Sequence, residues 1–205
     1  MNIDTFIFDL GGVIIDLDEK ATFNSFSEYS GLSIPEILKG VESSDIFYKI
    51  EKGFISEQAF RNGLRDLFKC DIIDTDLDMA WNAMLGAITQ ERLDLLTALR
   101  DKYKVLILSN TNSIHENAFN RILKKVSGKD NLSYFADTVF FSHELHMRKP
   151  DIEIYEEILK LSATKAESAL FLDDKEENLL GAREAGINTK RIEYPDQILE
   201  LRKYV

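Results

Sequence analysis

Residues 5–16 constrain the fold more than any other stretch of this chain, because they join a buried strand to a tight turn. Residues 6–8 form a short apolar run, which is typical of a buried strand. Asp9 follows this run directly, and Gly11 and Gly12 allow a turn that side chains would obstruct. Ligands of an open parallel sheet bind at the carboxyl ends of its strands, so this carboxylate suits a nucleophile beside a phosphate-binding turn. The alternative is a solvated aspartate that caps the turn.

The length and charge of the chain limit its function. Its 205 residues, of which 44% are apolar, can form one domain of ordinary size and a smaller insert. The 36 acidic residues outnumber the 25 basic ones and give a formal net charge of -11, which argues against nucleic acid as a partner. A small anionic substrate would therefore be held by local cations, a metal or backbone amides.

Cysteine content and hydropathy indicate the compartment. The single Cys70 excludes an intrachain disulfide and a cysteine-rich metal site, which fits a reducing compartment. No apolar run approaches the ~18 residues of a membrane span, and the N-terminus lacks the basic region of a signal peptide. We therefore expect a cytoplasmic protein without a membrane partner.

Residues 17–86 are predicted to form an all-helical insert. Apolar residues recur there at helical spacing, and Ser33 and Ser56 are suitable N-caps. The predicted helices cover residues 20–29, a short stretch after Ser33, 44–52, 57–68 and 76–85. We interpret the aromatic and methionine side chains of this insert as core residues rather than as ligand contacts.

From Thr89 onward the pattern alternates between helices and strands. The predicted strands are residues 104–108, 138–141, 169–172 and 189–192. The predicted helices are residues 91–102, 113–125, 152–161, 176–185 and a final one near 197–203. With the first strand, this order predicts an α/β fold with a Rossmann-like, doubly wound parallel sheet. Residues 1–16 and 87–205 would form this core domain, and residues 17–86 a small domain inserted after the first strand.

Polar side chains follow each of the four best-defined strands. They are Asp9, Ser109, the loop with His143, His146, Arg148 and Lys149, and the pair Asp173-Asp174. In a doubly wound sheet these strand ends face one crevice. Carboxylates for a hard cation, hydroxyl and amide groups for anionic oxygens, and a cation are the groups that phosphoryl transfer requires. Each group alone is also compatible with a turn, a solvated loop or a helix N-cap.

Four ordered motifs span the predicted core from end to end. They are residues 8–13, residues 108–112, Lys149 within residues 147–150, and residues 172–174 followed by Asn178 and Gly181-Ala182. In this order they resemble the four motifs of the haloacid dehalogenase-like hydrolase superfamily, subfamily IA. The insert matches the position of that family's small helical cap. Residues 110–112 and 147–150 look most like those of bacterial sugar-phosphate phosphatases, including α-glucose-1-phosphatases.

The resemblance implies a nucleophile and a magnesium site. Asp9 would be the nucleophile that forms an aspartyl-phosphate. Mg²⁺ would be bound by the Asp9 carboxylate, the backbone carbonyl of Gly11 and Asp174. Asp173 would lie near the ion without binding it directly. Oxygen ligands are what this ion prefers, and its charge would offset the repulsion between the nucleophile and the phosphoryl oxygens.

The same resemblance implies how the phosphoryl group would be held. Ser109 and the amide of Asn110 would bind it, and Lys149 would screen both the carboxylate and the phosphate. Ser109 and Lys149 would thus be substrate-binding and catalytic at once, and the partner would be a small phosphorylated molecule.

The chain departs from the family pattern at Gly11. Most phosphatases of the family have an aspartate two residues after the nucleophile that serves as general acid and base, whereas glycine supplies no proton. Asp16, Asp18 and His115 are candidate substitutes that the sequence does not rank. Leaving groups of low pKa, such as an anomeric oxygen, need protonation least, which favours an anomeric sugar phosphate.

Three functions are compatible with these residues. The favoured one is a magnesium-dependent phosphatase that acts on a small phosphorylated metabolite, with sugar phosphates as the expected class. A 2-haloacid dehalogenase would also lack the second aspartate, but it would leave the pair Asp173-Asp174 buried without a metal, which is costly. A non-catalytic regulatory protein of the same fold is supported only by Gly11.

Overall fold

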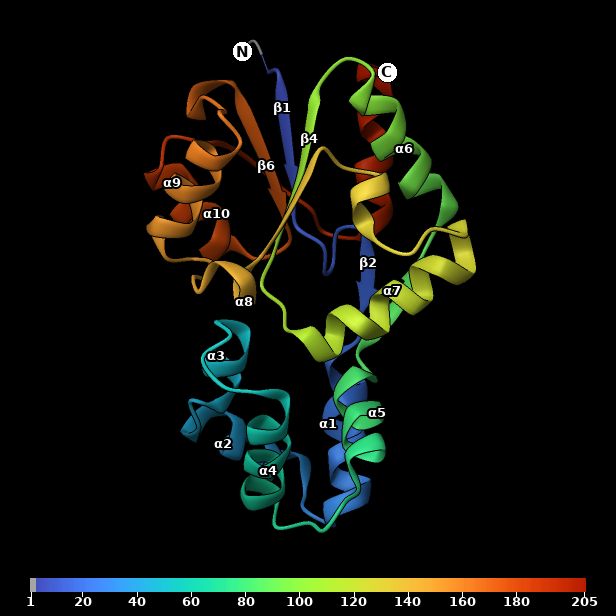
Figure 1. Ribbon diagram of the computed structural model, residues 1–205, viewed down its shortest axis with the longest axis vertical. Coiled ribbons are helices and arrows are strands. Elements are labelled where there is room, and N and C mark those ends of the chain that lie inside the picture. The colour runs from blue at the N-terminus through green and yellow to red at the C-terminus, as the bar shows by residue number, and fades with distance from the viewer. Residues whose placement is uncertain (1–2) are drawn as a thin grey trace.

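The computed structural model describes residues 3–205 and contains a sheet with its covering helices and a separate group of helices (Figure 1). The strands are β1 (Thr5–Phe8), β2 (Ile15–Leu17), β3 (Leu85–Ile88), β4 (Lys104–Ser109), β5 (Thr138–Phe141), β6 (Ala169–Asp173) and β7 (Asn188–Arg191). The α-helices are α1 (Glu19–Ser30), α2 (Ile34–Ser43), α3 (Ile46–Glu51), α4 (Glu57–Phe68), α5 (Asp74–Asn82), α6 (Gln90–Arg100), α7 (Ser113–Ser127), α8 (Ser142–Leu145), α9 (Ile152–Leu161) and α10 (Glu176–Glu184). The 3-10 helices are η1 (Leu132–Tyr134), η2 (Ala166–Ser168) and η3 (Pro195–Tyr204). No helix within residues 3–205 is long and apolar enough to cross a membrane.

Five parallel strands form the central sheet in the order β5-β4-β1-β6-β7, which confirms the predicted doubly wound α/β architecture. β1 lies in the middle, between β4 and β6. Phe8 is in register with Ile107 of β4 and with Leu172 of β6. The residues that follow these three therefore leave their strands at the same edge, where the carboxyl ends meet.

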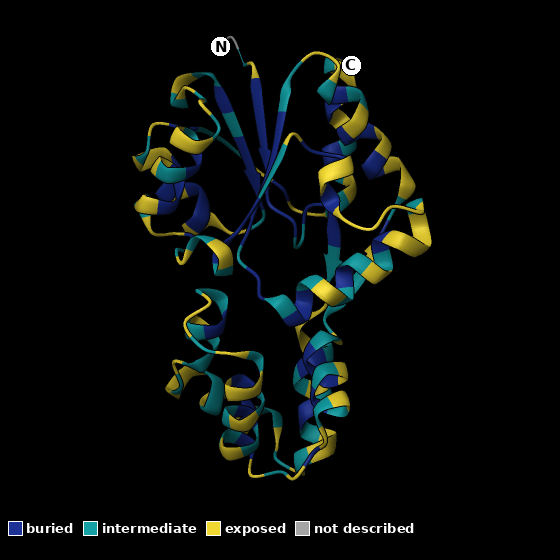
Figure 2. Ribbon diagram, in the orientation of Figure 1, coloured by how far each residue is buried: buried dark blue, intermediate teal, exposed yellow. Residues whose placement is uncertain are grey.

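Successive residues of β1 belong to separate hydrophobic cores on the two faces of the sheet. Phe6 and Phe8 pack in a core with apolar residues of α6, α7 and η3. Ile7 lies in the opposite core, with residues of α9 and α10. Figure 2 shows the strands buried between helices whose outer faces are exposed. Burial on both faces explains why β1 is a continuous apolar run rather than an alternating one.

Helices α1 to α5 pack around a core of their own, below the sheet in Figure 1. Phe60 and Phe68 have no exposed surface (0%), so their prediction as core residues is correct. Local capping starts these helices: the Ser56 hydroxyl accepts a hydrogen bond from the Ala59 N–H at 3.2 Å at the start of α4. We call residues 17–86 the helical segment below.

The prediction of a segment without strands is wrong at its boundary. β2 and β3 form a two-stranded antiparallel sheet where the chain enters and leaves the helices. A helix was expected over residues 76–85, but α5 ends at Asn82 and Leu85 already belongs to β3. The strands approach closely at Gly86, where a Cβ would lie 2.9 Å from the Asp16 carbonyl oxygen. A strand this short that contains a glycine has no periodic pattern to detect.

Two further segments differ from the prediction. The residues after β5, expected as a loop, begin with the short helix α8, which has 4 residues and is too short to show helical periodicity. The final helix, expected near residues 197–203, is the longer 3-10 helix η3, which begins at Pro195.

Candidate active site

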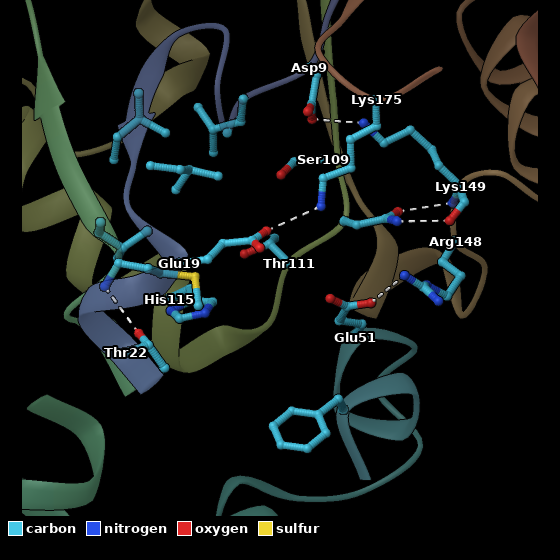
Figure 3. A pocket seen from close by; sticks show the side chains of 18 of the residues that line it. Asp9, Glu19, Thr22, Glu51, Ser109, Thr111, His115, Arg148, Lys149 and Lys175 are labelled. Atoms are coloured by element: carbon cyan, nitrogen blue, oxygen red, sulfur yellow. Dashed lines mark hydrogen bonds and ion pairs between the residues drawn. The ribbon is translucent and has the colours of Figure 1, made fainter. Parts of the chain in front are cut away.

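Side chains from four segments converge at the carboxyl edge of the sheet. Asp9 follows β1, Ser109 ends β4, and Asp173 ends β6. Lys149 comes from the loop between α8 and α9. Asp9, Ser109 and Lys149 line a cavity of about 500 Å³ between this edge and the helical segment (Figure 3). The fold thus brings together residues that are far apart in the sequence.

Lys149 is the buried cation of this group. Its Nζ lies 2.7 Å from Asp9 Oδ1 and 2.7 Å from Asp173 Oδ2, and it donates to the Leu108 carbonyl oxygen at 3.1 Å. The residue is only 1% exposed. Burial alone would lower the pKa of Lys149, but the two carboxylates outweigh that effect and raise the pKa, so the ammonium stays charged.

The Asp9 carboxyl group has lost most of its hydration, since the residue is 7% exposed. This burial raises its pKa to about 7, against the attraction of Lys149 and with the added repulsion of Asp173 and Asp174. Additional positive charge beside Asp9 would favour the ionised form, which is the form that can attack as a nucleophile.

Asp173 is occupied by hydrogen bonds from the chain. Its Oδ1 accepts from the Lys175 N–H at 2.8 Å and from Asn178 Nδ2 at 3.0 Å. Its Oδ2 accepts from Lys149 at 2.7 Å and from Asn178 at 3.0 Å. These partners leave little capacity for direct binding of a cation and support a role for Asp173 in positioning Lys149.

The environment of Asp174 fits a metal ion. One carboxylate oxygen from each of Asp9, Asp173 and Asp174 lies within 4.8 Å of the other two. Asp174 Oδ1 is buried and has no hydrogen-bond partner among residues 3–205. Burial and the nearby Asp173 raise the pKa of Asp174, so its charge is poorly compensated. Gly12 leaves room for this side chain: its φ is +70°, and a Cβ there would lie 2.6 Å from Asp174 Oδ2. An unpartnered oxygen beside two further carboxylates suits a hard cation such as Mg²⁺.

Side chains of Asn110 and Ser142 support the site in a way that the sequence does not predict. The Asn110 side chain accepts from the Lys149 N–H at 2.9 Å and donates to the Lys149 carbonyl at 2.8 Å, so it orients the loop that contains this lysine. The buried Ser142 hydroxyl accepts from the Thr111 N–H at 2.9 Å and donates to the Thr111 carbonyl at 3.1 Å. Ser142 directly follows β5, and a polar residue directly after a strand is the signal that could have identified it.

Comparisons with known proteins assign the chain to a family. Residues 3–186 match the model of the haloacid dehalogenase-like hydrolases. The chain belongs to this family. The hydrolase is 29% identical over 187 residues to D-ribitol-5-phosphate phosphatase of Bacteroides thetaiotaomicron, in a match that covers 91% of this chain and 90% of the relative.

Solved structures of the family resemble the whole hydrolase. An enzyme of the family from Bacteroides thetaiotaomicron, in complex with magnesium and inorganic phosphate, is 32% identical and has a TM-score of 0.81, with 92% of this chain and 93% of that chain covered. A HAD-like family hydrolase from Porphyromonas gingivalis has a TM-score of 0.89 at 25% identity and covers 100% of this chain and 98% of its own. The family inferred from the four sequence motifs is therefore confirmed.

The candidate substitutes for the missing acid of this hydrolase are poorly placed. Only His115 lines the cavity. Its Nδ1 lies 2.7 Å from Asn82 Oδ1, and burial lowers its pKa to about 3, so the ring is neutral near pH 7. Asp16 pairs instead with Arg92 at 2.8 Å, and Asp18 caps the start of α1. None of the three is therefore placed as a proton donor to a leaving group.

Two ion pairs that line the cavity connect the helical segment to the strand-end loops of the hydrolase (Figure 3). Glu51 of α3 lies 3.0 Å from Arg148, and Glu19 of α1 lies 3.3 Å from Lys175. All four side chains line the cavity. Burial raises the pKa of Glu51 although Arg148 opposes the change. The sequence does not reveal these pairs, because they depend on how distant segments pack.

Proposed function

We propose that this hydrolase is a magnesium-dependent phosphatase that uses Asp9 as a covalent nucleophile. The observation on which this rests is the buried cluster in which Lys149 contacts Asp9 while an oxygen of the neighbouring Asp174 has no partner within residues 3–205. Three carboxylates beside one ammonium leave an excess of negative charge that a divalent cation would balance. The magnesium and phosphate bound by the Bacteroides enzyme support the same reaction.

Groups of the chain perform the nucleophilic attack and hold the phosphoryl group. An Asp9 oxygen attacks phosphorus and forms an aspartyl-phosphate while the bond from phosphorus to the ester oxygen breaks. Ser109 Oγ and the Asn110 N–H hold the phosphoryl oxygens, and Lys149 neutralises charge on both reacting groups. The departing oxygen takes its proton from water, because Gly11 supplies none. A water molecule then attacks phosphorus, releases inorganic phosphate and restores the carboxylate.

The metal would be held by Asp9, Asp174 and the carbonyl oxygen of Gly11. Its charge would favour the ionised form of Asp9 and offset the repulsion between this carboxylate and the phosphoryl oxygens. The raised pKa of Asp9, about 7, supports this assignment, because a further cation would increase the ionised fraction of this carboxyl group at neutral pH.

We infer that the helical segment, residues 17–86, acts as a cap over the core formed by residues 1–16 and 87–205. The segment has its own hydrophobic core, and the chain crosses to it at the β2–β3 pair. The ion pairs of Glu19 and Glu51 are contacts that a closed cap would make. Closure of such a lid excludes water from the reacting groups.

The two other functions are less well supported by this geometry. A 2-haloacid dehalogenase has no use for a metal, and Asp174 would then keep a buried, uncompensated carboxylate oxygen. A purely regulatory protein would have no need of the contact between Lys149 and Asp9. The dehalogenase therefore leaves the Asp174 oxygen unexplained, and the regulatory protein leaves the contact between Lys149 and Asp9 unexplained.

The organic part of the substrate is a separate question. The missing acid at Gly11 favours an anomeric sugar phosphate, and the name of the D-ribitol-5-phosphate phosphatase supports sugar or polyol phosphates as the first class to test. The helical side of the cavity is mostly apolar, however, and favours a different organic group.

The test of the proposed function is phosphate release from phenyl phosphate by the purified full chain. We expect release that requires Mg²⁺, stops on chelation and resumes when Mg²⁺ is restored. Acid quenching during turnover should trap a phosphorylated protein that hydroxylamine cleaves, as it cleaves acyl phosphates. Metal-independent release of halide from 2-chloropropionate, without phosphate release, would establish the dehalogenase instead.

A further inference from the structure

The part of the cavity that the helical segment forms is mostly apolar. Its side chains come from α1, α2, α3, α5 and the residues just after α5: Phe23, Phe26, Val41, Phe47, Trp81 and Met84. The interpretation of the aromatic and methionine residues of this segment as core residues agrees with the packing of this group. They pack on the core of the helical segment, and they also face a space of about 500 Å³ that continues to Asp9 and Lys149.

Most polar groups that the helical segment contributes to the cavity already have partners, although Glu19 and Glu51 use only one carboxylate oxygen each. Thr22 Oγ1 donates to the Trp81 carbonyl at 3.0 Å and accepts from the Met84 N–H at 3.1 Å, so both its functions are used. Glu19 and Glu51 are held in the ion pairs described above. The indole N–H of Trp81 has no partner among residues 3–205, and it could serve one acceptor at most.

This lining discriminates between organic groups by their hydroxyl content. A hydroxyl that is buried against such a surface without a partner weakens binding by about tenfold. A methylene that is buried there strengthens binding by about fourfold. A polyol carries several hydroxyls, and within the apolar part of the cavity Trp81 with neutral His115 could pair with only a minority of them.

We propose that the organic part of the substrate is an apolar alkyl or aryl group, so that the enzyme hydrolyses phosphate monoesters of apolar alcohols. This inference rests on the proposed phosphatase function. The charged end of the cavity, at Asp9 and Lys149, fixes the phosphoryl group, and the apolar end receives the alcohol. Water replaces the alcohol on phosphorus, and the products are inorganic phosphate and the free alcohol.

A matched pair of substrates tests the proposal with the full chain in Mg²⁺. The substrates n-pentyl phosphate and D-ribitol 5-phosphate share a carbon chain and differ in their hydroxyls. We expect kcat/KM to be at least about tenfold higher for n-pentyl phosphate, since each unpaired hydroxyl costs about that factor. It should rise about threefold to fourfold per methylene through the n-hexyl and n-heptyl esters. The polyol is the better leaving group, so chemistry alone would favour the opposite order.

The outcomes separate this inference from the function on which it rests. Equal or higher kcat/KM for D-ribitol 5-phosphate would overturn the apolar substrate class and leave the phosphatase intact. Failure to release phosphate from either ester and from phenyl phosphate would overturn the phosphatase itself.

A variant locates the discrimination in the helical segment. Val41→Thr replaces a methyl group that faces the cavity by a hydroxyl of similar size, and should lower the pentyl-to-ribitol ratio of kcat/KM at least about threefold. Val126→Thr makes the same change on the exposed face of α7, where Val126 is 39% exposed, and should leave the ratio unchanged. Phe23→Tyr adds a hydroxyl at a partly exposed position and gives the same test if Val41→Thr does not fold. An unchanged ratio in a folded cavity variant would overturn the assignment.

Discussion

Lys149 contacts two carboxylates at once, so the charge balance around it depends on each of its neighbours. Asp9 faces the cavity and has a pKa of about 7, whereas Asp173 has no exposed surface (0%) and is enclosed by hydrogen bonds. Asp174 has an oxygen with no partner within the described residues. Three adjacent carboxylates therefore have three different environments, and their substitution should have different effects.

Asp9→Asn should reduce phosphate release to below about one-thousandth of the wild-type rate while the fold is kept. The amide has the shape of the carboxylate but is no nucleophile. Phosphate release and thermal unfolding would be measured together, with the exposed Asp71→Asn as a control that keeps full activity. Substantial turnover by Asp9→Asn would contradict covalent catalysis.

The raised pKa of Asp9 predicts how the stability of the metal-free protein depends on pH. The pKa is about 7 in the folded state against 3.8 for an unperturbed aspartate, so between these values the folded chain binds more protons than the unfolded chain. The free energy of unfolding should therefore fall as the pH rises from about 4 to about 7. Urea denaturation in a chelator at pH 5 and pH 7 measures this slope. It should be smaller in Asp9→Asn, and an equal slope in both proteins would contradict the prediction.

Asp174→Asn and Asp173→Asn should fail in different ways. Asp174→Asn should raise the Mg²⁺ concentration for half-maximal activity by about tenfold or more, because it weakens a metal ligand. Asp173→Asn should mainly lower thermal stability, because it disturbs the hydrogen bonds of Asp173 to Lys149, Lys175 and Asn178. Magnesium titrations of activity and melting curves of both variants would show this, and the reverse pattern would exchange the two roles.

The missing acid at Gly11 should make the rate depend steeply on the pKa of the leaving group. Gly11 does not have a positive φ, and the obstacle to a side chain is Leu17, whose Cδ1 would lie 2.5 Å from a new Cβ. Gly11→Asp combined with Leu17→Ala should therefore flatten that dependence, with Leu17→Ala alone as the control. The measurement is a series of substituted phenyl phosphates, and a wild type indifferent to their pKa would indicate that another residue already donates the proton.

At the scale of elements, the sequence predicts those helices and strands that have a clear local pattern of apolar residues. Residues 138–141 and 152–161 were expected as a strand and a helix, and β5 and α9 have these bounds. β3 was missed because Gly86 interrupts its few apolar residues, and α8 because 4 residues make little more than one helical turn. Polar residues directly after strands, such as Asp9, could be selected as site candidates by the same local argument.

Contacts between elements could not be predicted in this way. The two hydrogen bonds between the Asn110 side chain and the Lys149 backbone join residues that lie 39 positions apart in the sequence. The pair Glu51–Arg148 joins α3 to the loop after α8. Both contacts depend on how the elements are placed in space. Periodicity in a single sequence indicates local structure and gives no information about that placement.

The helical segment meets the rest of the molecule differently on its two sides. At α5 and α7 the contact is mainly apolar, since Ile114 of α7 belongs to the core of the helical segment and Trp81 stacks on His115, with one hydrogen bond between His115 and Asn82. At α3 and α8 it is polar, with Glu51 beside Arg148 and the His146 ring 2.8 Å from the Lys52 carbonyl oxygen. Polar contacts exchange more readily with water, so the α3 side is where we expect the cap to open.

Glu51→Gln should therefore loosen α3 without unfolding the protein. We expect faster amide hydrogen exchange over residues 46–55, because the variant removes the charge that holds Arg148. Lys49→Gln breaks the exposed pair Asp45–Lys49 within the same helix and should leave exchange nearly unchanged. Equal exchange in both variants would show that the ion pair does not hold the cap closed.

At the scale of the whole molecule, the net charge of -11 acts against an anionic substrate. A phosphate ester approaches against a long-range repulsion that salt screens. Attraction begins only near the cavity, where Arg148, Lys149 and Lys175 are part of the lining. Binding therefore depends on groups at short range, and the surface as a whole does not attract the substrate.

The central place of β1 has a consequence for biosynthesis. β1 leaves the ribosome before its partners β4 and β6, which come from residues 104–109 and 169–173. The apolar β1 strand of the nascent chain therefore stays unpaired until β4 and β6 have been synthesised. Helices α1 to α5 can pack on one another before that. A chain interrupted before β6 has a compact helical part and an open sheet edge. Such a chain lacks Asp173 and Asp174. Asp9 is therefore synthesised before the other site residues, but it cannot act until they have been added.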